Sequence, residues 1–233
     1  MRPIGTLRSC YGQKFGIPRQ AGLVPAATAV LELDPAVVTR DALRGLEGFS
    51  HVWVIFRFHL AADVKMTVRP PRLGGARKVG VLATRSPHRP NHLGLSAVAL
   101  ARVDLDGLSL ELRGGDFLDG TPVYDVKPYL PYADALPDAT AAWADPPIPR
   151  SNVTFSPVAA AFCAVTPGMS EVVAQSLALD PRRPGARGGT YAMRIGPWDV
   201  RCRAEPDGSW FVDGFVRVDD GAATAEPDPD DEA

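Results

Sequence analysis

Polar and apolar residues alternate, or apolar residues gather in short β-branched and aromatic runs, through the first part of the chain. Runs of this kind bounded by Gly, Pro, Asn or Asp are typical of strands joined by tight turns. The predicted strands cover residues 52–58, 79–84, 96–103, 108–112 and 123–127. Helical spacing is confined to residues 41–46 in this part. The pattern therefore predicts a closed or nearly closed β-barrel over residues 1–143.

A proline-rich stretch, residues 144–152, has the composition of a linker, and the pattern changes beyond it. Helical spacing covers 159–165 and 170–179, with Thr166 and Pro167 at the expected start of the second helix. Three strands are predicted at 190–195, 198–203 and 210–212. The expected fold class is therefore mainly β, an N-terminal barrel followed by a small C-terminal α+β domain at 153–218. Because so small a domain is marginal alone, we expect it to pack against the barrel or a partner subunit.

Charge is distributed unevenly along the chain. Residues 219–233 hold seven acidic residues and no basic one, a composition that predicts a solvated, disordered tail. The remaining chain carries 25 basic residues against 20 acidic ones. Residues 64–103 contain eight basic residues and no acidic one. A stretch of one sign of this length predicts a face for a polyanion or an anionic ligand.

Several classes of protein are not favoured by this sequence. No apolar run approaches the length of a membrane span, and the first residues lack the pattern of a secretory signal. The cysteines are Cys10, Cys163 and Cys202, odd in number and far apart, which is typical of reduced thiols. We therefore expect a cytoplasmic protein without membrane association.

The common catalytic motifs are also missing. No glycine-rich phosphate-binding motif of the Rossmann or P-loop type occurs, and no nucleophile elbow. His88 and His92 are four residues apart, but Pro90 between them breaks the helix that would align two metal ligands, so no metal site is expected. Ser86 and His88 share a proline-rich turn that rarely gives the geometry of a nucleophile and its base.

Three stiffened loops carry groups suited to one ligand. Pro87 and Pro90 restrict the backbone around two arginine forks, which suit phosphate, carboxylate or the plane of a base. A second loop offers an arginine and a planar amide at 18–22, and a third offers the Asp119 carboxylate for a ribose diol or an ammonium group. Together they predict a pocket with aromatic walls from Trp53, Phe58 and Tyr124.

These loops also carry a family resemblance. Five blocks in order form one pattern: KFGIPRQAGLV at 14–24, LRGLEGFSH at 43–51, TVRPPRLGG at 67–75, ATRSPHRPN at 83–91 and DGTPVYDVKPYLP at 119–131. DPRRP at 180–184, Tyr191 and DVR at 199–201 continue it. The chain resembles the TsaA-like (TrmO) family of tRNA methyltransferases over about residues 3–203.

The resemblance implies a TsaA-like β-barrel methyltransferase outside the Rossmann class, a homodimer with its cofactor near the subunit interface. It implies S-adenosyl-L-methionine as cofactor and tRNA as partner, with methylation of N6 of N6-threonylcarbamoyl-adenosine beside the anticodon. The cofactor-binding positions carried over by the resemblance are Pro18, Arg19, Gln20, His59, Leu60, Arg85, Leu95, Leu118, Asp119, Gly120 and Thr121. The chain departs from the family pattern at His92, where a proline is common.

Methyl transfer to a urea-like nitrogen requires alignment of the reacting atoms and loss of a proton. Asn91 and Asp125 are the candidate catalytic residues, although a plain sheet-edge position explains Asp125 equally well. Arg89 suits the planar threonyl carboxylate. The remaining substrate-binding candidates, expected on tRNA phosphates, are Arg69, Arg72 and Lys78. Two alternatives stay open: a non-catalytic RNA-binding barrel, and a methyltransferase with the same cofactor and a small-molecule acceptor.

Overall fold

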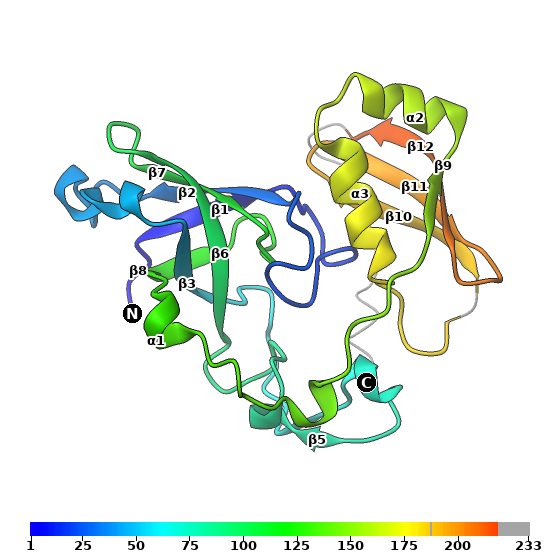
Figure 1. The fold of residues 1–233 in the computed structure, drawn as a ribbon, viewed down its shortest axis with the longest axis horizontal. Helices are drawn as coiled ribbons and strands as arrows, with labels where there is room; N and C mark the ends of the chain where they lie inside the picture. The colour runs from blue at the N-terminus through cyan, green and yellow to red at the C-terminus, as the bar shows by residue number, and fades with distance from the viewer. Residues whose placement is uncertain (187, 219–233) are drawn as a thin grey trace.

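Two β-sheets lie side by side in the computed structural model, which describes residues 1–186 and 188–218 (Figure 1). Six antiparallel strands close into a barrel, in the order β1-β2-β7-β6-β3-β8. They are β1 (Gly5–Ser9), β2 (Thr28–Leu33), β3 (His51–Arg57), β6 (Leu93–Asp104), β7 (Ser109–Arg113) and β8 (Pro122–Pro128). Pairing of β1 with β8 closes the ring. The expected mainly β fold with a barrel is confirmed.

The alternating pattern of the strands builds the barrel interior. In β3, Val52, Val54 and Phe56 are at most 2% exposed, whereas Trp53 and Ile55 lie on the outer wall. Their inner partners come mainly from leucines and valines of the other strands. Burial of this apolar surface is the main favourable term in folding.

Some short elements differ from the predicted ones. The strand predicted at 79–84 is wrong beyond Gly80, because β4 (Thr67–Val68) and β5 (Val79–Gly80) pair only briefly and a 3-10 turn follows at Val81–Ala83. The helix predicted at 41–46 is two 3-10 turns, Arg40–Leu43 and Leu46–Gly48, separated by Gly45 in a left-handed conformation (φ +86°). Further short turns and one helix are Pro71–Leu73, α1 (Pro131–Asp134) and Ala142–Ala144. The strands β1 and β2 were not among those predicted.

The second sheet has the order β10-β11-β12-β9, with β9 parallel to β12 (Figure 1). Its elements are β9 (Val153–Phe155), α2 (Pro157–Ala164), α3 (Met169–Ala178), β10 (Gly189–Ile195), β11 (Trp198–Ala204) and β12 (Trp210–Arg217). The expected combination of two helices and strands is confirmed, with β9 in addition. The second helix begins two residues later than expected, with Gly168 rather than Thr166 as its N-cap.

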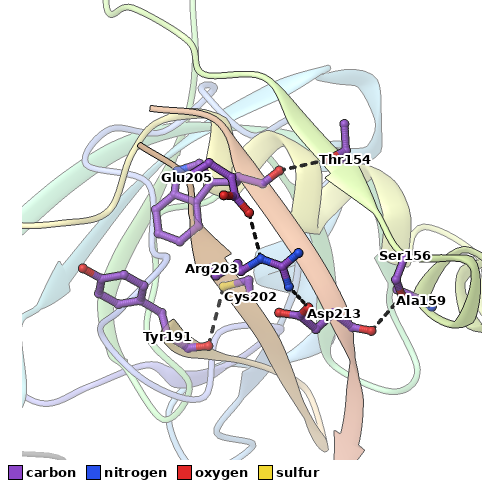
Figure 2. A network of polar contacts seen from close by, with 9 residues as sticks. Thr154, Ser156, Ala159, Tyr191, Cys202, Arg203, Glu205 and Asp213 are labelled. Atoms are coloured by element: carbon purple, nitrogen blue, oxygen red, sulfur yellow. Dashed lines mark hydrogen bonds and ion pairs between the residues drawn. The ribbon is translucent and has the colours of Figure 1, made fainter. Parts of the chain in front are cut away.

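Polar contacts fix the ends of these elements (Figure 2). The Ser156 hydroxyl oxygen accepts the N–H of Ala159 at 3.0 Å and donates to the carbonyl of Asp213 at 2.7 Å, so it caps α2 and ties the helix to β12. Arg203 of β11 donates to Glu205 at 2.7 Å and pairs with Asp213 on the neighbouring strand β12. These contacts hold the sheet and α2 in one orientation.

Residues before the barrel's second strand complete the core of the second sheet. Tyr11, Val24 and Ala27, all at most 2% exposed, pack in the same cluster as Val173 of α3 and Trp210 of β12. The second sheet therefore packs directly on the segment 10–27, which joins β1 to β2. The segment belongs to both cores.

Candidate functional site

The segments that carry the predicted cofactor residues leave the barrel at one end. Because adjacent barrel strands are antiparallel, the loops 10–27, 58–92 and 114–121 all connect strands at the same rim. The opposite rim carries the 105–108 hairpin and residues 34–50. The topology therefore brings together loops that lie up to about a hundred residues apart in sequence.

The first two loops meet through Arg85 and Gln20. The Arg85 guanidinium donates to the side-chain oxygen of Gln20. Pro18 is buried in the same loop, whereas Arg19 is exposed. A guanidinium, an amide and a stiffened backbone thus face one region, as the three-loop pocket requires.

Asp116 reinforces this junction, although it was not among the predicted site residues. Its carboxylate accepts a hydrogen bond from the Ser96 hydroxyl at 2.7 Å. Burial raises the pKa of Asp116, while the Ser96 hydrogen bond and the positive charge of Arg85 oppose the rise. Asp116 therefore links the barrel interior to two of the loops. In the sequence, the sign that could have pointed to Asp116 is its position directly beside the predicted Leu118–Thr121 turn.

The turn at 118–121 is held from below by β1. Asp119 Oδ1 accepts the N–H of Ser9 at 2.9 Å, and the N–H of Asp119 donates to the carbonyl of Tyr11 at 2.9 Å. Gly120 has φ of +77°, a conformation that favours glycine, and its N–H donates to the Leu7 carbonyl. The Asp119 carboxylate is consequently exposed at the rim in a fixed orientation.

His59 faces this turn from the end of β3. Its Nδ1 lies 3.4 Å from the Thr121 hydroxyl oxygen, and a Cβ on Gly120 would come within 3.9 Å of Nε2. Burial lowers the pKa of His59, and the negative charge of Asp119 partly offsets this. The structure brings His59, Asp119 and Thr121 together as the predicted site requires.

Apolar side chains are exposed beside these polar groups. Leu60 and Leu95, two predicted cofactor positions, are 56% and 55% exposed. Leu60 lies on the 58–92 loop and Leu95 near the start of β6, and three more large apolar residues of that loop are also exposed: Val64, Met66 and Leu82. We call these five residues the rim patch. Exposed apolar patches of this kind mark ligand or subunit contacts.

The loop 84–92 is braced by its own side chains. The hydroxyl of Thr84 donates to the Val81 carbonyl, and Nη1 of Arg89 donates to the Thr84 carbonyl at 3.2 Å. His92 is 7% exposed, has φ of +51°, and its Nδ1 lies 2.9 Å from the Pro87 carbonyl oxygen. Proline cannot adopt that φ, so the departure from the family pattern comes with a different backbone conformation.

The two predicted catalytic residues do not line the same pocket. A cavity of about 350 Å³ is lined by Asn91, Tyr124, Arg57, Leu93 and Met1. Asp125 is paired with Ile55 on the outer wall, and its Oδ1 accepts the N–H of Val126. Asn91 thus lies in a pocket next to the loops predicted to bind the cofactor, and Asp125 lies on the neighbouring sheet surface.

The basic residues predicted to contact tRNA differ in their surroundings. Arg69 and Lys78 are exposed beside the β4–β5 pair. Arg72 instead donates to two carbonyl oxygens of the linker, those of Ala144 (2.8 Å) and Pro146. We call the β4–β5 pair with Arg69, Arg72 and Lys78 the basic lobe. Arg72 attaches the basic lobe to the linker, in addition to any contact with a ligand.

The part of the chain that the structure describes offers neither a metal-binding cluster nor a membrane-spanning helix. Within residues 1–186 and 188–218, no group of three or more His, Cys, Asp or Glu side chains is placed to hold a metal ion. No helix in those ranges is long and apolar enough to cross a bilayer.

The closed barrel, with groups suited to a ligand gathered on the loops of one rim, defines a β-barrel protein with a candidate site built from several loops. The model of the tRNA-methyltransferase O N-terminal domain matches residues 6–135, and the chain belongs to this TrmO family. A tRNA (adenine(37)-N6)-methyltransferase of Escherichia coli strain K12 is 43% identical over 218 residues, which are 88% of this chain and 93% of the relative.

Proteins of Pseudomonas aeruginosa give a similar picture. An RcsF protein is 58% identical over 147 residues, so the match spans 62% of this chain and 60% of that relative's length. The crystal structure of TrmO from Pseudomonas aeruginosa superposes with a TM-score of 0.76 at 41% identity, over 92% of this chain and 96% of that one. The similarity therefore extends through both sheets.

Proposed function

We propose that this chain is an S-adenosylmethionine-dependent tRNA methyltransferase that methylates N6 of N6-threonylcarbamoyl-adenosine at position 37. The observation that carries the proposal is the junction of the three loops at one barrel rim, in a chain of the TrmO family. The similarity to the Escherichia coli tRNA (adenine(37)-N6)-methyltransferase over 93% of its length supports the acceptor.

The groups at the rim suit each part of S-adenosylmethionine. Arg85, Gln20 and Arg19 offer donors for a carboxylate, and the exposed Asp119 offers an acceptor for a ribose diol or an ammonium group. The exposed apolar side chains of Leu60 and Leu95 provide a surface for the adenine ring. The cofactor, when bound, supplies a methyl group activated by its sulfonium.

The remaining cofactor positions shape the site rather than supply charge. Pro18 stiffens the first loop, and Gly120 keeps the turn free of a side chain next to His59. Leu118 and Thr121 close the turn through the hydrogen bond from the Thr121 hydroxyl to the Leu118 carbonyl (2.7 Å). Such preorganisation is what an alignment-dependent reaction needs.

The acceptor nitrogen must lose a proton as the new N–C bond forms. We propose Asn91 as the residue that orients this nitrogen, because it lines the cavity beside the cofactor loops. Asp125 is the proposed proton acceptor. It lies opposite Ile55 on the outer wall of the β3–β8 pair. Arg69, Lys78 and Arg72 are proposed on tRNA phosphates, and Arg89 near the threonyl group.

We also propose a homodimer that buries the rim patch. Five large apolar side chains are exposed on the 58–92 loop and at the start of β6, which is costly in water, and a second copy bound at this rim would cover them. The patch includes two cofactor positions, Leu60 and Leu95, so the second subunit would enclose the cofactor site. Sedimentation of the wild type and of Leu82→Asp tests this, since Leu82→Asp should shift the protein towards monomer.

Mass spectrometry of tRNA nucleosides from a deletion strain, before and after complementation, tests the activity. The expected result is loss and return of the methylated threonylcarbamoyl-adenosine. Purified protein with labelled cofactor and tRNA separates the alternatives. Cofactor binding without tRNA methylation favours a small-molecule acceptor, and lack of cofactor binding favours a non-catalytic RNA-binding barrel.

A further inference from the structure

Arg57 is a cation at the rim of the barrel whose surroundings, among the described residues, include no counterion. It is the last residue of β3, it lies on the outer wall opposite Leu93 of β6, and it is exposed. Within residues 1–186 and 188–218, no hydrogen-bond or ion-pair partner of Arg57 is found. Arg8 and Arg102, by contrast, lie on barrel strands and pair with Glu32 and Glu111.

The cavity beside Arg57 has the composition of an anion-binding pocket. Its lining residues are Met1, Arg57, Asn91, Leu93 and Tyr124, which include a guanidinium, an amide and a phenol but no carboxylate. A guanidinium presents a planar fork that matches a carboxylate or a phosphate, and an amide adds a further donor.

The chain places this cavity next to the proposed cofactor site. Arg57 lies two residues before His59, Leu93 two residues before Leu95, and Tyr124 three residues after Thr121. In each of these three pairs, one residue lies at the end of a barrel strand, and the other lies on the same strand or on the loop that adjoins it. A group held in the cavity is therefore a neighbour of whatever the three loops hold.

We propose that Arg57 binds the carboxylate of the threonylcarbamoyl group and thereby selects the modified base. This inference rests on the proposed function. Only a few bonds separate that carboxylate from the N6 nitrogen, so an anion site beside the cofactor loops is where it must lie. Arg89, the other candidate, already donates a hydrogen bond from Nη1 to the Thr84 carbonyl within its own loop. A tRNA phosphate has the same anionic chemistry and is the alternative occupant.

Methyl transfer to two tRNAs tests the assignment, one carrying N6-threonylcarbamoyl-adenosine and one carrying its threoninamide counterpart. Wild-type kcat/KM should favour the carboxylate. Arg57→Gln should lower kcat/KM on the carboxylate tRNA by about 10- to 100-fold and by less than about 3-fold on the amide tRNA, because the lost contact is a charged hydrogen bond. Arg57→Lys should recover part of the loss. Arg40→Gln, at the opposite rim, is the matched control and should behave as the wild type.

Other outcomes have defined meanings. An equal loss on both tRNAs would assign Arg57 to a phosphate, and an unchanged ratio in Arg57→Gln with a collapsed ratio in Arg89→Gln would assign the carboxylate to Arg89. Either result overturns the proposal. Thermal melting and cofactor affinity should be unchanged in Arg57→Gln, which excludes misfolding. Failure of the wild type on the threonylcarbamoylated tRNA would instead overturn the proposed function.

Discussion

The phenol oxygen of Tyr11 lies 3.0 Å from the hydroxyl oxygen of Ser176, in a fully buried contact between the barrel's first loop and α3. The backbone of Tyr11 forms bridges to Leu118 of the proposed cofactor turn on one side and to Ile195 of β10 on the other. One residue therefore joins the second sheet to the turn that presents Asp119. The second sheet therefore supports the turn proposed to bind the cofactor.

Tyr11→Phe should destabilise the protein because it leaves the Ser176 hydroxyl without its buried partner. We expect a loss of about 1–2 kcal/mol in the free energy of unfolding, the usual cost of such an orphaned group. Chemical denaturation measures it, with Tyr132→Phe as control, since Tyr132 is 88% exposed. If both variants unfold at the same denaturant concentration as the wild type, the contact between the Tyr11 phenol and Ser176 does not stabilise the fold.

Arg85→Ala and Asp119→Ala should each weaken S-adenosylmethionine binding by about 1–3 kcal/mol, because each removes a charged partner of the ligand. Titration calorimetry measures the affinity. Arg102→Ala is the matched control, since Arg102 pairs with Glu111 and lies away from the rim loops. Unchanged affinity in both variants, with circular dichroism as in the wild type, would place the cofactor elsewhere.

Asp116 should give the stability a pH dependence of defined sign. Burial raises its pKa in the folded state, so the folded protein holds this proton more tightly than the unfolded chain does. The free energy of unfolding should therefore fall as the pH rises from the ordinary Asp pKa of about 3.9 through the raised value. Asp116→Asn keeps an acceptor oxygen for Ser96 but does not titrate, so its stability should decline less over that range.

Urea denaturation of the wild type and of Asp116→Asn at several pH values compares the two slopes. Asp138→Asn controls for the loss of one exposed carboxylate. Parallel curves for the wild type and Asp116→Asn would contradict the raised pKa.

The barrel was predictable because its strands bury one face and the apolar pattern records it. Val52, Val54 and Phe56 alternate with outward residues, and β3 is found where the pattern placed it. The segment 79–84 is equally apolar, yet its partner β4 has two residues, so pairing stops at Gly80 and Val81 begins a turn. Strand length there is set by tertiary pairing and not by local composition.

The loops of the candidate site were predictable where a loop motif carries its own chemistry. Arg85 and Gln20 were both predicted, and the structure adds their direct contact. Tyr11 and Arg57 were not, because their roles depend on what lies opposite them in space. A tyrosine at the end of a strand has no local sign that it reaches α3. An arginine at the end of an apolar strand likewise has no local sign that no counterion faces it among the described residues.

Substitutions in the basic lobe should distinguish residues that contact tRNA from a residue that also stabilises the fold. Arg69 and Lys78 are exposed, so Arg69→Gln with Lys78→Gln should flatten the plot of log affinity for tRNA against log salt, by about 0.7–0.9 per lost phosphate contact. Arg72→Gln should in addition lower thermal stability, because it removes the donors that hold the linker carbonyls of Ala144 and Pro146. Binding at several salt concentrations and thermal melting of each variant provide the two readouts. Cofactor affinity should stay at the wild-type value in Arg69→Gln with Lys78→Gln, because the contacts that join the three rim loops are made by other residues, Arg85 with Gln20 and His59 with Thr121. A salt slope equal to that of the wild type in all of these variants would exclude the lobe from the tRNA interface.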